Sequence, residues 1–450
     1  MATALIILAA GKGTRMNSDL PKVLHPIAGA PLLVHAMKSA VPLDAERTIV
    51  VAGHGAETVE RAALSWNPEA QVVVQAEQLG TAHAVAQAKD ALAGFAGTAI
   101  VLYGDTPFIS SEILEALQEK QTNTDVVVLG FEAADPARYG RLVTNGNTLE
   151  KIVEFKDATE AERAIALCNS GVVAADAQTL FSLIEAVGND NAAGEYYLTD
   201  IVGIARDRGL STAVERCDEA ETLGINSRAE LVAAEAAFQT RARQAALDDG
   251  VAMAAPETVY FAHDTVVGRD AIIEPNVVFA PGVTVESGAK IRAFSHLEGC
   301  HVSRDAVVGP YARLRPGAEL QEAAKVGNFV EVKNAVLAEG AKVNHLSYIG
   351  DAEIGARTNV GAGTITCNYD GVFKHKTTVG EDAFIGSNTM LVAPVTIGHE
   401  AMTASGSVIT SDVPDGDLAV ARGRQDNKKG LARRMFEKLK SKKAKQAKGA

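Results

Sequence analysis

Three stretches of this 450-residue chain combine residue types and spacings that could carry out chemistry. The first, residues 10–16 (AGKGTRM), directly follows a continuous apolar run at residues 5–9. Glycines after a strand let backbone N–H groups approach phosphates, and a lysine and an arginine supply the counter-charge. The stretch fits neither the Walker pattern nor the dinucleotide fingerprint, so Gly11 and Gly13 could equally form a tight turn between a strand and a helix.

The second stretch ends at Asp105, which follows an apolar run at residues 100–103. A carboxylate in this position is a natural ligand for Mg²⁺, which usually takes only one or two protein ligands. The alternative is a turn-forming aspartate before Thr-Pro. Nearby in the chain, Gln75 ends another apolar run, and Gly80 and Thr81 begin a helical stretch. Amide and backbone groups there could read the edge of a pyrimidine, or Thr81 could simply cap the helix.

The third stretch contains His345, within residues 344–350 (NHLSYIG). Histidine is the side chain best placed to accept or release a proton near neutral pH. A lone histidine could also be an ordinary polar residue at a corner of the fold. The basic pair Arg315 and Lys333, together with Tyr348, recurs at the spacing of the repeat described below, and this favours a site.

The elements that must position the first two stretches form an α/β sheet. Strand-like apolar runs alternate with helical stretches, at residues 5–9, 48–52, 71–75, 100–103 and 126–131. This alternation predicts a doubly wound sheet. Ligands of such sheets bind beyond the carboxyl ends of the strands, which is where the glycine loop, Gln75 and Asp105 would lie.

The third stretch belongs to a repeat. Between about residues 266 and 409 an aliphatic side chain recurs in steps of six, often followed by glycine, from Val267 to Ile397. A hexapeptide period predicts a parallel β-helix, whereas a sandwich would alternate in twos with turns every 8–12 residues. The step is interrupted from Thr366 to Thr378, and loops that leave a rigid scaffold often carry function.

These patterns predict four parts of the chain. Residues 1–228 form the α/β domain, and residues 229–249 form a linking helix that begins with a capping box between Ser227 and Glu230. Residues 250–425 form the β-helix, and residues 426–450 form a basic tail that we expect to be disordered.

Composition narrows the class of protein. No apolar run reaches ~18 residues, and no basic region precedes the first apolar run, so we expect neither a spanning helix nor a signal peptide. The four cysteines lie far apart, which predicts reduced thiols in a cytoplasmic protein. The net charge is −13, although residues 422–450 carry twelve basic and two acidic residues. Such a tail could bind nucleic acid, but no nucleic-acid-binding module accompanies it, and we expect neither a nucleic acid nor a membrane partner.

Residues 8–16 (LAAGKGTRM) followed by residues 20–24 (LPKVL) resemble the signature of the sugar-1-phosphate nucleotidyltransferases. The resemblance implies a Rossmann-like domain that binds a nucleoside triphosphate. Arg15 would stabilise the departing pyrophosphate, Lys22 the transferred α-phosphate, and Asp105 with Asn226 would bind Mg²⁺. The residues that would contact the nucleotide and the sugar are Leu8, Ala9, Ala10, Gly11, Lys22, Gln75, Gly80, Thr81, Tyr103, Gly104, Asp105, Gly140, Glu154, Asn169 and Asn226.

The repeat resembles that of the hexapeptide acyltransferases, which form left-handed β-helices, assemble as trimers and bind acyl-CoA between neighbouring copies. Residues 361–371 (GAGTITCNYDG), and the whole chain apart from its tail, are similar to the bacterial bifunctional enzymes of UDP-N-acetylglucosamine synthesis. These fuse a glucosamine-1-phosphate N-acetyltransferase to an N-acetylglucosamine-1-phosphate uridylyltransferase.

This second resemblance implies roles in acetyl transfer. His345 would be the general base that takes a proton from the amine attacking the thioester. The residues that would hold the sugar phosphate are Arg315, Lys333, Tyr348 and Asn359. The residues that would bind acetyl-CoA are Ala362, Asn368, Tyr369, Ser387, Ser405 and Arg422. The family often carries alanine where this chain has Ser405, and the residues after Arg422 also depart from its pattern.

Three functions are compatible with these features. The first is a two-reaction enzyme that uses acetyl-CoA and UTP as co-substrates with Mg²⁺, is active as a homotrimer, and supplies precursors of the cell wall and lipopolysaccharide. The second is a single-activity nucleotidyltransferase whose β-helix only assembles or regulates the protein. The third is a non-enzymatic subunit that binds sugar nucleotides, which predicts loss of the Arg15, Lys22 or Asp105 types. All three residues are present, and the first function is our prediction.

Overall fold

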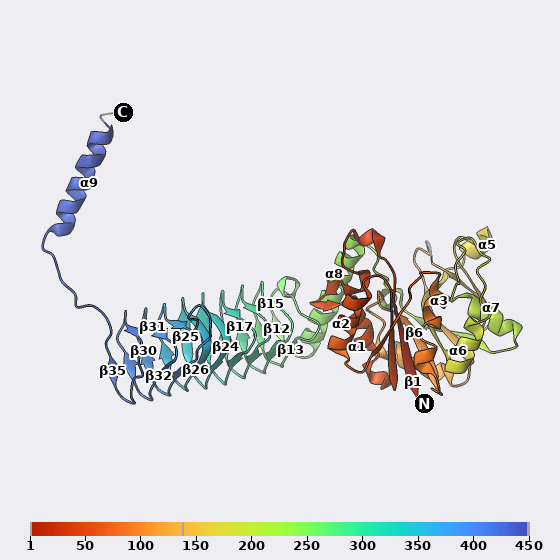
Figure 1. Cartoon of the computed structure of the whole chain (residues 1–450), viewed down its shortest axis with the longest axis horizontal. Helices are drawn as coiled ribbons and strands as arrows, with labels where there is room; N and C mark the ends of the chain where they lie inside the picture. The colour runs from red at the N-terminus through yellow and green to blue at the C-terminus, as the bar shows by residue number, and fades with distance from the viewer. Residues whose placement is uncertain (1, 137–138, 448–450) are drawn as a thin grey trace. The chain divides into compact units, whose positions relative to one another are not determined.

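The computed structural model describes residues 2–136 and 139–447 (Figure 1). The described residues form two compact units, one within the ranges 2–246 and 260–265 and the other within the ranges 247–259 and 266–447. The expected linking helix is α8 (Arg228–Asp248), and the contacts assign nearly all of it to the first unit. Its start has the predicted reciprocal cap, because Ser227 Oγ accepts from the N–H of Glu230 and the Glu230 carboxylate accepts from that of Ser227.

The first unit is built on a mixed sheet of nine strands within the described residues, in the order β5-β4-β1-β6-β10-β7-β11-β9-β8. Strands β5, β4, β1 and β6 are parallel, and β10 runs antiparallel to both β6 and β7. In chain order the strands are β1 (Thr3–Ala9), β4 (Arg47–Ala52), β5 (Gln71–Val74), β6 (Thr98–Tyr103), β7 (Val126–Glu132), β8 (Arg141–Asn145), β9 (Thr148–Val153), β10 (Leu167–Asp176) and β11 (Thr212–Cys217).

Helices cover both faces of this sheet, which explains why its central strands read as continuous apolar runs. Side chains of β1 alternate between two separate cores: Ile6 and Leu8 point into one, and Leu5 and Ile7 into the other. The helices are α1 (Leu32–Ser39), α2 (Ala56–Trp66), α3 (Thr81–Ala86), α4 (Ser111–Gln121), α5 (Glu160–Arg163), α6 (Ala177–Ile184) and α7 (Asp200–Asp207), with a short hairpin of β2 (Pro26–Ile27) and β3 (Ala30–Pro31) before α1. The predicted doubly wound α/β domain is confirmed.

The second unit is a parallel β-helix, whose short strands stack coil upon coil (Figure 1). One face consists of β12 (Ala252–Met253), β14 (Ile272–Ile273), β17 (Lys290–Ile291), β20 (Val307–Val308), β23 (Lys325–Asn328), β25 (Lys342–His345), β27 (Asn359–Val360), β30 (Phe384–Ile385), β33 (Met402–Thr403) and β35 (Leu418–Ala419).

The remaining strands of the β-helix pair in parallel on its other faces. They are β13 (Val266–Val267), β15 (Val278–Phe279), β16 (Thr284–Val285), β18 (His296–Leu297), β19 (His301–Val302), β21 (Arg313–Leu314), β22 (Ala318–Leu320), β24 (Glu331–Leu337), β26 (Tyr348–Ile354), β28 (Ile365–Cys367), β29 (Thr377–Val379), β31 (Met390–Val392), β32 (Val395–Ile397) and β34 (Val408–Ile409). The predicted hexapeptide fold is confirmed, and the arrangement is consistent with left-handed coiling.

The six-residue step is the inward-facing position of each coil. From Ile273 to Ile397, each aliphatic residue of the predicted series is at most 4 % exposed. The six-residue step also continues at Thr366, the first residue of the predicted interruption, because Thr366 is fully buried in β28. Its hydroxyl accepts from the N–H of Gly350 at 2.8 Å and donates to the same residue's carbonyl at 3.0 Å, so a threonine can take an aliphatic position. The interruption is therefore confined to the loop that follows β28.

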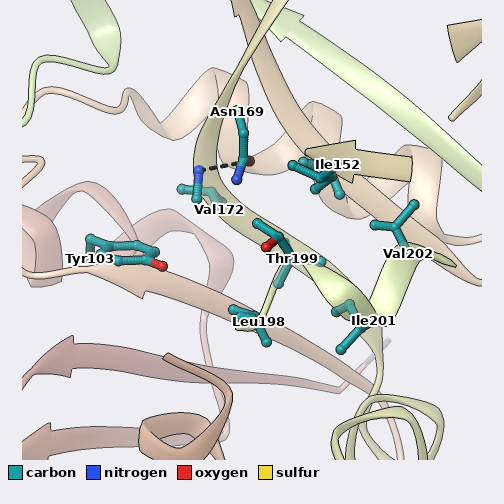
Figure 2. Close-up of a pocket in the computed structure, with 11 residues that line it drawn as sticks. Tyr103, Ile152, Asn169, Val172, Leu198, Thr199, Ile201 and Val202 are labelled. Atoms are coloured by element: carbon teal, nitrogen blue, oxygen red, sulfur yellow. Dashed lines mark hydrogen bonds between the residues drawn. The ribbon is translucent and has the colours of Figure 1, made fainter. Parts of the chain in front are cut away.

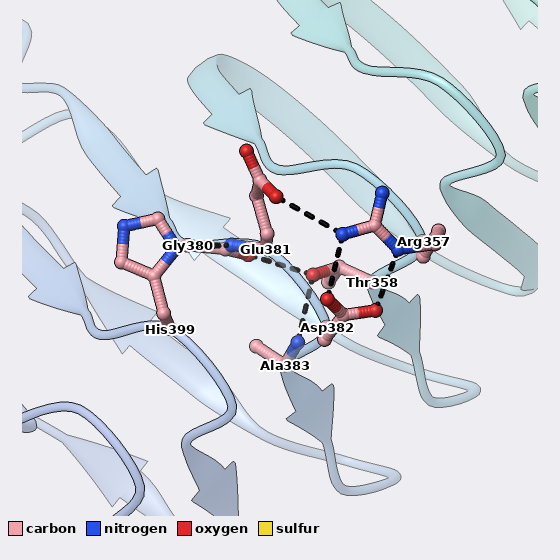
Figure 3. A network of polar contacts seen from close by, with 7 residues as sticks. All are labelled: Arg357, Thr358, Gly380, Glu381, Asp382, Ala383 and His399. Carbon is pink, nitrogen blue, oxygen red and sulfur yellow. Dashed lines mark hydrogen bonds and ion pairs between the residues drawn. The ribbon is translucent and has the colours of Figure 1, made fainter.

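Polar side chains at the corners tie consecutive coils together (Figure 3). Fully buried Thr358 donates to the carbonyl of Gly380 at 2.7 Å and accepts from the N–H of Ala383 at 3.0 Å. Beside it, the exposed guanidinium of Arg357 pairs with Asp382 at 2.7 Å and Glu381 at 3.0 Å. The buried threonine thus satisfies backbone groups that water cannot reach, while the arginine network lies in solvent.

The basic tail differs from its expected disorder. Residues 431–447 form helix α9 (Leu431–Ala447), and none of its side chains is buried. Alanine, leucine, lysine and arginine are strong helix formers, and no glycine or proline occurs between Leu431 and Ala447. Residues 448–450 of the predicted tail lie outside the described residues. Among the residues described, none of the helices has the length and the apolar composition needed to cross a bilayer.

The corner contacts predict unequal effects of two neighbouring substitutions. Replacing Thr358 by Val should lower the free energy of unfolding by about 2–4 kcal/mol, because it leaves a buried carbonyl and a buried N–H without partners. Replacing Arg357 by Ala should have little effect, because its ion pairs are exposed. Urea denaturation followed by circular dichroism measures both, and equal losses from the two variants would contradict this account of the corners.

Candidate active sites

The loops singled out in the first unit meet at one cavity. Its volume is about 420 Å³, and it lies beyond the carboxyl ends of β1, β5 and β6. The residues that line it are Leu8, Ala10, Gly11, Lys22, Val23, Gln75, Gln78, Gly80, Thr81, Ala84, Tyr103, Asp105, Glu195 and Asn226. Most of the predicted nucleotide contacts are therefore brought together by the parallel strands.

The ammonium of Lys22 lies between the two predicted metal ligands, Asp105 and Asn226. It pairs with the carboxylate of Asp105 and donates to Asn226 Oδ1 at 2.9 Å. A backbone bond from the N–H of Ile225 to the carbonyl of Asp105, 3.0 Å long, holds the Asn226 segment against the end of β6. Gly13 has a φ of 60°, and a Cβ there would lie 2.6 Å from Lys22 Cβ, so the glycine permits this close approach.

The oxygens of Asp105 and Asn226 fit a metal ion, because they already converge on a cation. They are hard oxygen donors of the kind that Mg²⁺ prefers. The described residues contain no cluster of three or more His, Cys, Asp and Glu side chains that could hold a metal by themselves. A metal held here would complete its coordination with water and with the phosphates of a substrate.

Apart from the predicted sugar contacts described below, three predicted residues do not line the cavity. Arg15 is exposed on the short 3₁₀ helix η1 (Thr14–Met16). Ala9 is buried within β1, and Gly104 lies under the cavity, where its N–H donates to the carbonyl of Leu8 at 3.0 Å. The backbone at these last two positions supports the site from below, and Arg15 would reach a ligand only from the rim.

Gln75 is 3 % exposed, and both hydrogens of its amide nitrogen are used inside the protein. Nε2 donates to the carbonyl of Gly80 at 3.1 Å and to Nδ1 of His83 at 3.0 Å. Because a carbonyl can only accept, these contacts leave Oε1 of Gln75 as an acceptor for a ligand. Gly80 is necessary here, since its φ is 121° and a Cβ would lie 2.4 Å from the carbonyl oxygen of Tyr196. His83 was not predicted to belong to the site, although it lies only eight residues after Gln75.

A smaller pocket adjoins this cavity and shares Tyr103 with it (Figure 2). Asn169 lines the pocket, and its N–H donates to the carbonyl of Gly140 at 2.9 Å. Thr199, another lining residue, donates to Glu154 Oε1 at 3.3 Å. The predicted sugar contacts Gly140, Glu154 and Asn169 are therefore close together, with hydrogen-bonding groups suited to hydroxyls.

Burial raises the pKa of two groups at this pocket. It raises the pKa of the partly buried Glu154 carboxyl, and the nearby Asp157 and Asp200 carboxylates raise it further, against the Thr199 hydrogen bond that lowers it. Burial also raises the pKa of Tyr103, so its hydroxyl stays protonated and can donate. The irregular part of β10 at Gly171 packs against the Tyr103 ring, where a Cβ would lie 2.6 Å from the ring.

A second group of polar residues lies on the β-helix. The backbone of Arg315 bonds to Val332 of the next coil, and Lys333 pairs in register with Gly350 of the coil after it. The Tyr348 hydroxyl occupies the space that a side chain at position 350 would fill, 2.3 Å from a built Cβ. Arg315 also donates to Glu331 at 2.8 Å. Predicted residues from three coils are thus brought onto one face.

This face contains further groups that the sequence analysis did not assign to the site. The neighbouring Lys374 ammonium lowers the pKa of Lys333, as does Arg315 to a lesser degree, and Asp351 opposes them. Asn368, predicted to bind acetyl-CoA, donates to Asp351 at 2.5 Å and to the Tyr348 hydroxyl at 3.4 Å. A cavity of about 360 Å³, lined by Lys374 and Asp351 among others, adjoins the cluster. The concentration of cations suits a phosphate.

His345 lies on β25, across a corner from this cluster. Its Nδ1 is 2.9 Å from Oδ1 of Asn328, which stands in register with it one coil earlier. Oδ1 can only accept, so His345 carries its proton on Nδ1 and leaves Nε2 with a free lone pair. Among the residues described, no side-chain hydrogen bond or ion pair joins His345 to Arg315, Lys333 or Tyr348. Asn328 was overlooked as a site residue because an asparagine in a strand gives no signal without its partner.

The remaining predicted residues follow another corner. Ala362, Ser387 and Ser405 occupy successive coils. The N–H of Asn388 donates to the carbonyl of Ala362 at 2.7 Å, and the N–H of Gly406 donates to the carbonyl of Ser387 at 2.8 Å, so backbone bonds link the three coils. The guanidinium of Arg422 donates to the carbonyl of Ser405 at 2.6 Å, which places these two predicted contacts together. Asn359 lies just before Ala362, at the start of β27, and Tyr369 is 61 % exposed in the loop after β28.

Comparisons with known proteins cover both units. The MobA-like NTP transferase domain matches residues 5–192, and the bacterial transferase hexapeptide (six repeats) matches residues 264–299 and 376–411. Full-length relatives are also similar. A bifunctional protein GlmU of Ruegeria sp. (strain TM1040) is 68% identical over 449 residues, and one of Roseobacter denitrificans is 69% identical over 450 residues. In both comparisons the match covers 100% of this chain and 100% of the relative.

Because the pKa of Glu154 is raised, replacing this residue by glutamine, its neutral isostere, should increase the free energy of unfolding by an amount that depends on pH. Between the ordinary carboxyl pKa and the raised one, the folded state binds more protons than the unfolded state, so wild-type stability falls as pH rises through this window. Glu154→Gln removes that loss, and its stabilisation should grow with pH and then level off above the raised pKa. Urea denaturation from pH 4 to 8 measures it, with Glu60→Gln on the exposed side of α2 as control. A difference that is constant across pH would contradict the prediction.

Proposed function

The chain belongs to the family of bifunctional GlmU proteins, and from this premise we propose how its two units divide the family's work. The enzyme is a glucosamine-1-phosphate N-acetyltransferase and an N-acetylglucosamine-1-phosphate uridylyltransferase, acting in UDP-N-acetylglucosamine synthesis. The α/β unit carries out uridylyl transfer and the β-helix acetyl transfer. The observation that best supports this division is the presence of two separate cation-containing clusters, one in each unit.

Uridylyl transfer joins a phosphate oxygen of N-acetylglucosamine-1-phosphate to the α-phosphorus of UTP, and pyrophosphate leaves. Gln75 would bind the uracil through its free Oε1, and Glu154, Asn169 and the Gly140 backbone would bind the sugar hydroxyls. Lys22 and Arg15 would neutralise the phosphates, which is the main task of a protein in this type of reaction. Family membership indicates a divalent metal ion, and we take it to be Mg²⁺ held by Asp105 and Asn226, where it would offset charge that develops on the phosphates.

In acetyl transfer the amine of glucosamine-1-phosphate attacks the carbonyl carbon of the thioester. His345 Nε2 accepts the proton that the amine loses, the C–S bond breaks, and the thiolate leaves and takes up a proton to become the coenzyme A thiol. Asn328 holds the imidazole in the tautomer that this step requires. Arg315, Lys333 and Lys374 would hold the sugar phosphate, with Tyr348 and Asn359 on the sugar. Ala362, Ser387, Ser405 and Arg422 would bind the coenzyme along one corner, with Asn368 and Tyr369 on the adjoining loop.

The hexapeptide repeats suggest oligomerisation, and the proposed assembly is a homotrimer. The separation of His345 from Arg315 and Lys333 by a corner of the β-helix favours this, because a neighbouring copy could bring the missing groups to each histidine. Tyr369 and Phe373, both more than 60 % exposed in the loop after β28, offer apolar surface for such a neighbour. The proposed location is the cytoplasm, where UTP and acetyl-CoA are available, with no nucleic acid or membrane as partner.

Two substitutions should separate the two reactions. His345→Ala should reduce thiol release from acetyl-CoA by about 10²–10⁴-fold while pyrophosphate release from UTP continues, because it removes only a general base. Arg15→Ala should reduce pyrophosphate release by about 10²–10³-fold and leave thiol release intact, because it removes charge stabilisation in the other unit. Thiol detection with Ellman's reagent and a coupled pyrophosphate assay measure both. A His345→Ala enzyme with normal thiol release would favour a single-activity nucleotidyltransferase with a structural β-helix.

The contact between Asn328 and His345 predicts a signature in the pH profile. Asn328→Leu should reduce thiol release on the order of tenfold, because the imidazole loses the acceptor that fixes its tautomer. Asn328→Asp should retain most activity and move the acidic limb of the profile to higher pH, because a carboxylate stabilises the imidazolium. If both variants lose activity equally and the limb does not move, Asn328 has only a structural role.

A further inference from the structure

Lys22 occupies the position between the two oxygens that the proposed function assigns to a divalent cation. Its ammonium pairs with Asp105 and lies 2.9 Å from Asn226 Oδ1. The side chains of Lys22 and Asp105 are only 14% and 15% exposed, so the pair is largely shielded from water and salt. Asn226 Nδ2 is turned away, toward the carbonyl of Gly224 at 3.4 Å, which leaves Oδ1 for the ammonium.

The main chain at Lys22 is anchored, whereas its side chain has several rotatable bonds. The residue begins the short helix η2 (Lys22–Leu24), and the next two residues, Val23 and Leu24, are buried in the core. Gly13 packs directly against its Cβ. A fixed Cα and a flexible four-carbon side chain allow the ammonium to move by rotation of side-chain torsions alone, without a shift of the loop.

The same two oxygens cannot hold an ammonium and a divalent cation together. At the separations of ordinary ligands the repulsion between these charges is large, even with the effective dielectric of a partly exposed site. A divalent cation can bind only if Lys22 leaves, and Lys22 then needs another anion. Within the cavity that contains all three residues, that anion would be a phosphate of the nucleotide.

We propose that Lys22 is a resident counter-ion of the metal site, which holds Asp105 and Asn226 in place and keeps the divalent cation out until a nucleotide offers its phosphates. Binding of the metal and delivery of the lysine to the phosphates are then one exchange of cations. The lysine is a positioning residue in this first state and a phosphate ligand in the second. The inference rests on the proposed function, because it takes Asp105 and Asn226 as the metal ligands.

The test measures metal binding to the full-length protein in the absence of nucleotide, with Mn²⁺ as the probe and the electron paramagnetic resonance signal of free Mn²⁺ as the readout. Lys22→Met should bind Mn²⁺ at least about tenfold more tightly than the wild type, because it removes the competing charge and retains a side chain of similar length. The gain should disappear in the double variant Lys22→Met/Asp105→Ala, which places the added binding at this carboxylate.

Lys12→Met is the matched control. It removes one positive charge from the same loop, but Lys12 is exposed and does not line the cavity. Its Mn²⁺ affinity should stay within about twofold of the wild type, because a charge in solvent is screened. Lys22→Met with unchanged affinity, or Lys12→Met with an equal gain, would overturn the proposal. Either result would leave the proposed function standing, provided that Arg15→Ala and His345→Ala still separate the two reactions.

Discussion

The inward stacking of one side chain in every six is the constraint on which the second half of this protein depends. Each buried side chain fixes its coil against the next, and the backbone bonds between coils then place outward residues of the strands in register with those of the neighbouring coil. Asn328 reaches His345, and Lys333 reaches Gly350, because of this register. The site on the β-helix is thus positioned by its core, although none of its side chains belongs to that core.

The first unit solves the same problem differently. Its central strands are buried on both faces, so their ends are held rigidly and their loops converge at one edge of the sheet. The polar groups at this edge are themselves largely buried and have internal partners: Gln75 with Gly80 and His83, and Lys22 with Asp105 and Asn226. Pre-organisation of this kind lowers the cost of ordering side chains when a ligand binds. When a ligand binds, some of these internal hydrogen bonds and ion pairs must also be replaced by contacts with the ligand.

Much of this arrangement could be predicted from the sequence, because period and strand order are local properties. The six-residue step predicted the buried positions of the β-helix from Ile273 to Ile397, and the apolar runs predicted the strands that end just before Gln75 and Asp105. What could not be predicted depends on partners that are distant in sequence. Thr366 reads as a break in the repeat until Gly350 is seen to satisfy its hydroxyl. Asn328 and His83 have no signal apart from the side chains that they hold.

The two clusters of cations differ in a way that bears on their ligands. In the first unit the charge of Lys22 is compensated by the carboxylate of Asp105, so this pair carries no net charge before a substrate binds. On the β-helix, Lys333 and Lys374 face one another, and the pKa of Lys333 is lowered mainly for that reason. Asp351 offsets only part of this repulsion, and it is also engaged by Asn334 and Asn368. A dianionic phosphate would relieve the repulsion that remains and raise the pKa of Lys333 again, so the charge of such a ligand would stabilise this cluster. Under the proposed exchange of cations, the first site must instead give up an existing ion pair, which would favour a ligand that brings both its own cation and its own anion.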